Sequence, residues 1–168
     1  EQLVEWVADT VKHHARPREA LTVVTIDREG PIGSEVFGLL RAHASLHGLF
    51  EVVGVRASER AVRRPREYER IRDELWANGA EWIKGGGALP EDESLSQELH
   101  SPEWLGQKSS KLKVTDKREI KKRIGRSPDR ADAVMLAVWE PTSVDDAPRA
   151  RKPHEDEDPA GLDREVDH

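Results

Sequence analysis

The spacing of apolar residues divides the first third of the chain into alternating helical and strand-like segments. Residues 2–14 carry apolar side chains at intervals of three and four with charged residues between them, which predicts an amphipathic helix. Residues 21–26 (LTVVTI) and 50–55 (FEVVGV) are apolar runs rich in β-branched side chains, so we expect strands that are covered on both faces. Between them we expect a turn over residues 27–34 and a helix over about residues 35–47.

The middle of the chain continues with helical periodicity. A long helix is expected over residues 67–84, and the triple glycine at 85–87 is expected to end it. No Gly-Lys-Ser/Thr follows these glycines, which excludes a phosphate-binding P-loop. A short helix near residues 93–99 comes next, followed by a strand at 111–115 in which polar and apolar residues alternate.

Two further helices are expected before the composition changes. The first begins after Asp116 and is strongly basic, and the second begins with Ser127 as N-cap, Pro128 in the first turn and Asp129 as an acid favoured by the helix dipole. The order of helices and strands predicts an α/β fold. Its strands are expected to be at least partly parallel, because helices connect them.

Composition changes sharply near residue 140. Residues 141–168 hold nine acidic residues against four Lys and Arg, with almost no large apolar side chains, which predicts a disordered acidic tail. Residues 1–140 are nearly neutral and large enough for one domain with its own core. The chain has no cysteine, which excludes disulfides, thiolate zinc sites and cysteine nucleophiles, and no apolar run long enough to span a membrane.

Positive charge is concentrated in two segments of the near-neutral domain. Residues 108–126 hold nine Lys and Arg against two acids, and residues 56–72 hold seven Arg against three Glu. Next to carboxylates, such segments suit a phosphate backbone, although each segment alone is equally well explained as a solvated surface. The cations that we expect to contact phosphates are Lys111, Lys113, Lys117, Lys121, Lys122, Arg123 and Arg126.

Two acidic residues are the best candidates for chemistry. Asp27 ends the first predicted strand, and active residues of open α/β sheets gather at the carboxyl ends of strands. Its position alone favours the alternative of an Asx-turn. Asp132 lies between alanines in the most apolar predicted helix, where a buried carboxylate has to be paired, neutralised or bound to metal.

Asp129 lies three residues before Asp132 on the same helical face, so both side chains can point at one ion, although Asp129 is also well placed as a first-turn helix acid. Hard cations such as Mg²⁺ and Mn²⁺ bind a few carboxylates together with water and phosphate oxygens, and paired ions promote phosphodiester cleavage. We therefore expect Asp27 and Asp132 to share a site for one or two such ions, with Asp129 close by.

Residues 111–138 (KLKVTDKREIKKRIGRSPDRADAVMLAV) resemble the C-terminal signature of the large terminase subunits of tailed bacteriophages. In that family a lysine-rich strand, a KKRxGRSPD run and an ADA motif precede a final apolar helix. Residues 27–33 with their glycines, 72–76 (RDELW) and 87–90 (GALP) follow in the family's order, so the resemblance covers about residues 1–139. It implies a metal-dependent nuclease domain with an RNase H-like mixed sheet flanked by helices, which cuts concatemeric viral DNA during genome packaging.

By this resemblance Asp27 corresponds to the second catalytic acid of the family and Asp132 to the third, and Asp129 lies where some members have another metal-site residue. The family's first catalytic aspartate lies on a strand before the helix that matches residues 2–14. We therefore expect this chain, which begins at Glu1 rather than methionine, to lack the first strands and to cut poorly alone. The implied partners are double-stranded DNA and, in a longer protein, the packaging ATPase domain, the small terminase subunit and the portal, in the host cytoplasm and without a membrane.

Two other functions fit the same residues. A non-catalytic module would bind DNA or packaging partners through residues 108–126, and another RNase H-like enzyme, such as a resolvase or transposase, would use the same acids. Sequence before Glu1 discriminates best between them. A strand with an aspartate there, after a domain with Walker motifs, favours the terminase nuclease.

Overall fold

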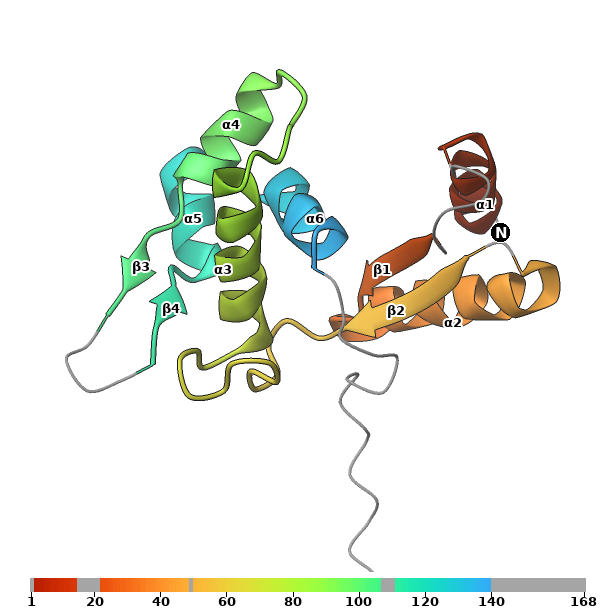
Figure 1. Ribbon diagram of the computed structural model, residues 1–168, viewed down its shortest axis with the longest axis horizontal. Coiled ribbons are helices and arrows are strands. Elements are labelled where there is room, and N and C mark those ends of the chain that lie inside the picture. Colours follow the sequence, from red (N-terminus) through yellow and green to blue (C-terminus); the bar gives the residue numbers. More distant parts are fainter. Residues whose placement is uncertain (1, 15–21, 49, 107–110, 140–168) are drawn as a thin grey trace, which may run out of the picture.

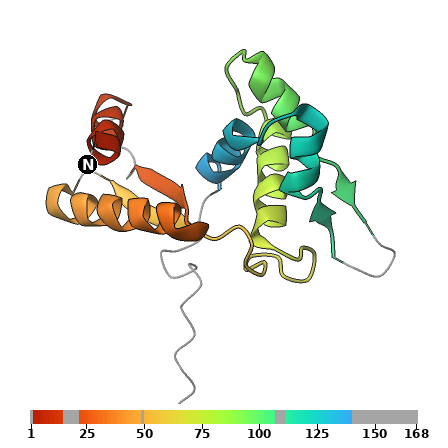
Figure 2. The ribbon, with the colours of Figure 1, turned by 180° about the vertical axis from the view of Figure 1, so that it is seen from behind.

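The computed structural model of the chain describes residues 2–14, 22–48, 50–106 and 111–139. In chain order its elements are α1 (Gln2–His14), β1 (Val23–Asp27), α2 (Gly30–His47), β2 (Glu51–Val55), α3 (Ile71–Lys84), α4 (Glu93–His100), β3 (Trp104–Leu105), β4 (Lys113–Val114), α5 (Lys117–Ile124) and α6 (Asp129–Ala137). They form two groups that lie side by side, α1 to β2 in one and α3 to α6 in the other (Figure 1). The view from behind shows the same division (Figure 2).

The first group is built on two parallel strands. β1 pairs with β2 from Val23 opposite Glu51 to Asp27 opposite Val55. Parallel strands need a long connection between them, and here α2 supplies it and packs against both strands. The core of this group contains Val4, Ala8, Val11, Leu40, Ala44 and Phe50. The predictions of a helix at residues 2–14 and of parallel strands are therefore confirmed.

The second group packs around α3. Its core contains Val53, Val55, Ile71, Leu75, Trp76, Leu95, Val114, Ala131, Met135 and Trp139. α3 and α6 approach so closely at Gly79 that a Cβ there would lie 1.9 Å from the Met135 Sδ atom. Because β2 contributes Val53 and Val55 to this core and α6 also contacts β1, the two groups are joined where β1, β2 and α6 meet.

Two helices begin at residues that the sequence did not predict. α2 begins at Gly30, within the predicted turn, because Pro31 lies in its first turn, where the fixed φ of proline suits a helix and its missing N–H is not needed. α3 begins at Ile71 rather than four residues earlier. There the Asp73 carboxylate accepts the backbone N–H of Arg70 at 2.9 Å and so fixes where the helix begins.

The other differences concern helix caps and a short strand. The residue before α6 is Pro128 rather than Ser127, and Pro128 itself makes no side-chain cap hydrogen bond. Asp116 does precede α5, but its side chain makes no cap hydrogen bond either. β4 confirms part of the predicted strand at 111–115, and it pairs antiparallel with β3, which is too short to show a pattern in the sequence.

The predicted acidic tail at 141–168, and with it the domain boundary near residue 140, lies outside the described residues. Within the described ranges, no helix combines the length and apolar character that crossing a membrane would require.

Candidate functional site

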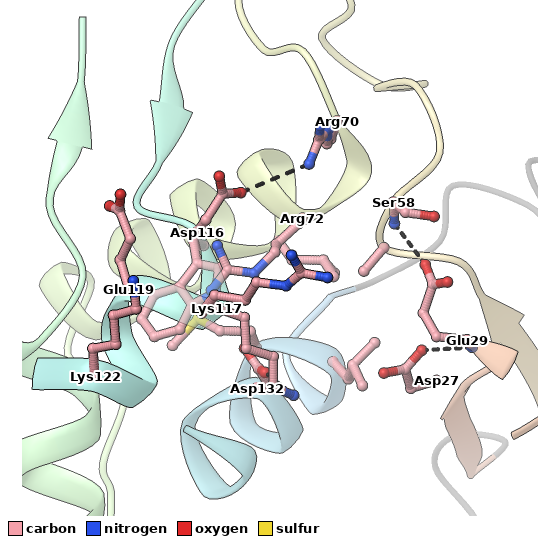
Figure 3. Close-up of a pocket in the computed structure, with 16 residues that line it drawn as sticks. Asp27, Glu29, Ser58, Arg70, Arg72, Asp116, Lys117, Glu119, Lys122 and Asp132 are labelled. Atoms are coloured by element: carbon pink, nitrogen blue, oxygen red, sulfur yellow. Dashed lines mark hydrogen bonds and ion pairs between the residues drawn. The ribbon is translucent and has the colours of Figure 1, made fainter. Parts of the chain in front are cut away.

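A pocket of about 630 Å³ lies where the two groups meet, and both candidate carboxylates line it. Its wall is formed by the loops that follow β1 and β2, by the start of α3, and by α5 and α6. Asp132 and Lys117 lie on one side of the pocket, and Asp27 and Glu29 lie on the other (Figure 3). The fold therefore brings Asp27 and Asp132, about 100 residues apart in sequence, to one cavity.

Asp27 is held at the carboxyl end of β1 by backbone contacts. Its Oδ1 accepts the backbone N–H of Glu29 at 2.9 Å, which is the predicted Asx-turn. The Glu29 carboxylate accepts the backbone N–H of Ser58 at 2.7 Å and so links the loops that follow the two parallel strands. A Cβ at Gly33 would lie 2.2 Å from the Asp27 carbonyl oxygen, so the first turn of α2 can pack against Asp27 only because residue 33 is glycine.

Asp132 lies one turn into α6 and is paired, as its position predicted. Its Oδ2 lies 2.9 Å from Lys117 Nζ on α5, and the same ammonium lies 3.0 Å from Asp129 Oδ1. Asp132 is only partly buried, with 23% of its side chain exposed, because it faces the pocket. One cation therefore contacts both aspartates of α6, which confirms that their side chains share a helical face.

The ion pairs change the pKa values of Lys117 and Asp129. Burial alone would lower the pKa of Lys117, but hydrogen bonds and charge interactions with Asp132 and Asp129 raise it above its ordinary value. The Ser127 hydroxyl and then Lys117 lower the pKa of Asp129 by hydrogen bonding to its carboxylate. Lys117 and the two aspartates of α6 therefore form one cluster at the edge of the pocket.

Arg72 adds a second cation beside the pocket. Its Nη1 donates to the Thr115 carbonyl at 2.8 Å, while Nη2 is buried with no hydrogen-bond partner among the described residues. Burial lowers the pKa of Arg72, and the nearby Asp132 charge opposes that change. A desolvated guanidinium with an unused donor favours an anion in its neighbourhood.

The oxygen donors of the pocket match the chemistry of Mg²⁺ and Mn²⁺. These ions use one or two carboxylates and complete their coordination with water and substrate phosphates, so Asp27 and Asp132 fit such an ion, with Asp129 beside them. Among the described residues, no three His, Cys, Asp or Glu side chains gather closely enough to hold a metal without further ligands. The assignment of Asp27, Asp129 and Asp132 as metal ligands stays a prediction.

The cations that we expected to contact phosphates differ in their surroundings. Four are in ion pairs: Lys113 with Glu69 (2.6 Å), Lys117 with Asp129 and Asp132, Arg123 with Glu103 (2.7 Å) and Arg126 with Glu98 (3.1 Å). Lys111, Lys121 and Lys122 make no ion pair with a described residue, and Lys121 and Lys122 are exposed on α5. Their roles at DNA stay predictions, with Lys121 and Lys122 the most accessible.

Three residues near the site were not identified from the sequence. Arg118 is exposed on α5 and lines the pocket, and Arg72 lies at the start of α3. Nothing in the local pattern marks Arg72, because its burial depends on α5 and α6. Glu98 is buried on α4, and here a signal exists, since it shares a helical face with Leu95 and Leu99.

No protein-family model matches the chain, and no curated protein sequence matches it. Its fold is similar to that of the nuclease domain of the large terminase subunit gp2 of bacterial virus Sf6. A lysine-to-alanine variant of that domain, solved with manganese, superposes with a TM-score of 0.64 at 15% identity and covers 82% of this chain and 72% of that one. The nuclease domain without that substitution gives a TM-score of 0.61 at 16% identity, with 82% and 71% covered.

The variant solved with calcium gives the same values as the unsubstituted domain, a TM-score of 0.61 at 16% identity with 82% and 71% covered. The chain therefore has the RNase H-like fold of a terminase nuclease domain, which confirms the predicted fold class. Its described strands form two separate pairs, one parallel and one antiparallel. At this level of identity the likeness establishes the fold.

Proposed function

We propose that this chain is the metal-dependent endonuclease domain of a phage large terminase subunit, which cuts concatemeric viral DNA during genome packaging. The observation that carries the proposal is the meeting of Asp27 and Asp132 in one pocket of a terminase-nuclease fold. Asp27 is placed at the carboxyl end of a parallel strand, where α/β folds position their active residues. Two acids brought together over about 100 residues of sequence are a more specific feature than the fold alone.

Asp27 and Asp132 are the residues that would hold the divalent ions, and Asp129 is an additional oxygen donor on the same face of α6. We propose that two Mg²⁺ or Mn²⁺ ions bind. When bound, they would activate the attacking water and stabilise charge on the phosphate. Lys117 neutralises part of the charge of the two α6 carboxylates. Arg72 and Lys117 then favour the approach of a negatively charged phosphate to the pocket.

The surfaces beside the pocket suit a DNA backbone. On one side α5 exposes Arg118, Lys121 and Lys122, none of which makes an ion pair with a described residue. The loop between β2 and α3 exposes three more arginines without an ion pair in the described structure, namely Arg60, Arg63 and Arg66. Because the same loop contributes Ser58 and Arg70 to the pocket, we propose that both surfaces contact phosphates of one duplex.

In this proposal the domain acts as part of a packaging motor in the host cytoplasm. Its partners there are double-stranded DNA, the packaging ATPase domain, the small terminase subunit and the portal. The support is the fold shared with a terminase nuclease domain. A non-catalytic DNA-binding module is the second candidate, favoured by the observation that no three acidic or histidine side chains converge among the described residues.

The deciding experiment is nicking of supercoiled plasmid in Mn²⁺, with the 168-residue chain and with any longer natural sequence that contains it. We expect Asp27→Asn and Asp132→Asn each to abolish cleavage, because an amide keeps the shape of the side chain but lacks the charge that holds a divalent ion. Circular dichroism should show that both variants fold. Calorimetry should show a weak Mn²⁺ signal for the chain that disappears in Asp132→Asn.

Two results would contradict the proposal. Variants that nick like the parent would show that these aspartates are not the catalytic acids. DNA binding without cleavage would favour the non-catalytic module, if it were found for the 168-residue chain and for longer natural sequences, in Mg²⁺ as well as in Mn²⁺.

A further inference from the structure

A buried glutamate lies next to the site but has no role in the function proposed above. Glu98 on α4 is 3% exposed, and both of its carboxylate oxygens are used. Oε2 accepts the backbone N–H groups of Arg130 at 3.0 Å and Ala131 at 3.1 Å, and Oε1 accepts from Arg126 Nε at 3.1 Å. A carboxylate that is removed from water needs such partners, so their arrangement is informative.

Glu98 takes the place of an N-cap for α6. The first N–H groups of a helix have no partner within the helix, and a side chain of the preceding residue usually satisfies one of them. Pro128, the residue before α6, makes no such bond. Glu98 instead reaches from another helix and places a negative charge at the positive end of the α6 dipole.

The two residues that Glu98 holds come directly before Asp132. Ala131 has no exposed surface and belongs to the core, so the backbone at this point has little freedom of its own. Glu98 therefore holds the backbone directly next to Asp132, whose side chain lines the pocket. On its other side the Asp132 carboxylate is paired with the ammonium of Lys117, which is on a flexible side chain.

We propose that Glu98 is a positioning residue, which fixes the start of α6 so that the Asp132 carboxylate faces the pocket where a divalent cation binds. The inference rests on the proposed function, because it concerns the same metal site. It assigns Arg126, which we expected at DNA, to the support of Glu98. Arg126 also donates to the Gln97 side chain at 2.9 Å and to the Ser94 carbonyl at 3.1 Å, so its guanidinium is bound on α4.

The chain contains a matched control for this role. Glu74 on α3 is 2% exposed and also accepts a donor at each oxygen, from the backbone N–H groups of Val62 and Arg64. Those residues belong to the loop before α3 and do not line the pocket of Asp132. Glu98→Gln and Glu74→Gln therefore each replace a buried carboxylate that holds backbone N–H groups, and of the two only Glu98 holds the residues directly before Asp132.

The experiment measures Mn²⁺ binding to the DNA-free chain by calorimetry and by paramagnetic broadening of backbone amide signals near Asp132. A glutamine at position 98 must turn its NH₂ group toward either Arg126 or the α6 N–H groups, which are all donors. We expect Glu98→Gln to weaken Mn²⁺ binding about 10-fold, as for other partners of metal ligands, and to speed amide exchange at Arg130 and Ala131. Glu74→Gln should lose comparable stability while its Mn²⁺ affinity stays within about twofold of the parent.

A second pair of variants separates positioning from folding. In Glu98→Gln/Arg126→Leu the amide NH₂ no longer faces a guanidinium, so its oxygen can accept from α6, and Mn²⁺ affinity should recover toward the parent. Glu98→Ala/Arg126→Leu lacks that acceptor and should stay about 10-fold weaker. This comparison carries the test if Glu98→Gln alone does not fold.

The outcomes are distinct. Three results would each overturn the positioning role while leaving the metal site intact. They are parent-like Mn²⁺ binding in Glu98→Gln, an equal loss of Mn²⁺ affinity in Glu74→Gln, and equal Mn²⁺ affinity in the two Arg126→Leu double variants. A parent chain whose signals near Asp132 do not respond to Mn²⁺ would instead overturn the metal site on which both proposals depend.

Discussion

Lys117 sets the charge of the metal site that we propose in this pocket. Its ammonium contacts Asp129 and Asp132, so the three groups together carry a net charge of about −1, and Asp27 across the pocket adds another carboxylate. In our proposal a divalent ion would therefore enter a site that is already partly neutralised. We expect its affinity to depend on whether Lys117 stays between the two aspartates or turns toward a substrate phosphate.

The Asp129 carboxylate gives the chain a specific response to acid. Because its pKa is lowered in the folded state, its contribution to stability is complete above the ordinary aspartate pKa of about 4 and is lost as the pH falls through the lower folded value. Asp129 is largely exposed, so we expect an effect below about 1 kcal/mol. Urea unfolding between about pH 2.5 and pH 6 should show a shallower loss of stability in Asp129→Asn than in the parent.

Ser127→Ala serves as the control for this prediction. The Ser127 hydroxyl is the largest cause of the lower Asp129 pKa, so its removal should reduce the acid sensitivity in the same direction without removing the carboxylate. Equal acid sensitivity in all three proteins would show that the interactions of Asp129 do not contribute to stability.

Sequence reasoning found the acids of the site more readily than the groups around them. Asp27 was recognisable because it ends a predicted strand, and Asp132 because it lies in an apolar helix, where a carboxylate needs an explanation. Arg72 and Glu98 owe their burial to contacts with segments more than 25 residues away, such as the Arg72 bond to Thr115 and the Glu98 bond to Arg130. The apolar face of α4 indicates that Glu98 is buried, but a local pattern does not identify the distant partners of either residue.

At the scale of elements, the cations of α5 are of two kinds, paired and unpaired. Arg123 and Lys117 point toward carboxylates of the folded domain, whereas Lys121 and Lys122 are exposed without an ion pair in the described structure. Paired cations have already exchanged part of their hydration for protein contacts, so they gain less from a phosphate. We infer that DNA contacts the unpaired cations of α5.

This arrangement predicts how salt affects DNA binding. Each lysine that meets a phosphate contributes about 0.9 to the slope of log affinity against log salt concentration, so Lys121→Ala/Lys122→Ala should reduce the slope by about 1.8. Arg123→Ala/Arg126→Ala should change the slope little and lower stability, because these arginines hold Glu103 and Glu98. Fluorescence anisotropy with duplex DNA at several salt concentrations measures the slope for the parent and for each double variant. Equal reductions of the slope in the two double variants would contradict the distinction between paired and unpaired cations.

The elements themselves were largely predictable, while their ends were not. Helical periodicity identified α1 with the correct bounds, and the apolar β-branched runs identified β1 and β2. The start of α3 was missed because it depends on one hydrogen bond, which the Arg70 N–H donates to the Asp73 carboxylate. The cap of α6 was missed because it comes from Glu98 on α4. Side chain–backbone bonds of this kind are set by the folded structure rather than by periodicity.

At the scale of the whole molecule, the site exists because two groups of elements pack together. Asp27 belongs to the group with parallel strands, and Asp132 belongs to the helical group, so neither group contains the pocket alone. The contacts of α6 with β1, together with Val53 and Val55 in the helical core, connect the two. Anything that loosens this junction should weaken metal binding before it unfolds either group.

The last prediction concerns where the domain ends. Trp139 is 4% exposed and belongs to the helical core, and the Val138 carbonyl accepts a hydrogen bond from Asn78 at 2.9 Å, so the fold extends at least to residue 139.

Residues 141–168 contain few large apolar side chains that could offset the entropy of ordering them. A chain that ends after Pro141 should therefore keep the melting temperature of the parent within about 2 °C. A chain that ends after Val138 loses a buried tryptophan, which costs about 3–5 kcal/mol, so its melting temperature should fall by roughly 10 °C or more. Differential scanning calorimetry of the three proteins tests both expectations. A large loss on removing residues 142–168 alone would show that the acidic segment docks on the folded domain and that the boundary near residue 140 is wrong.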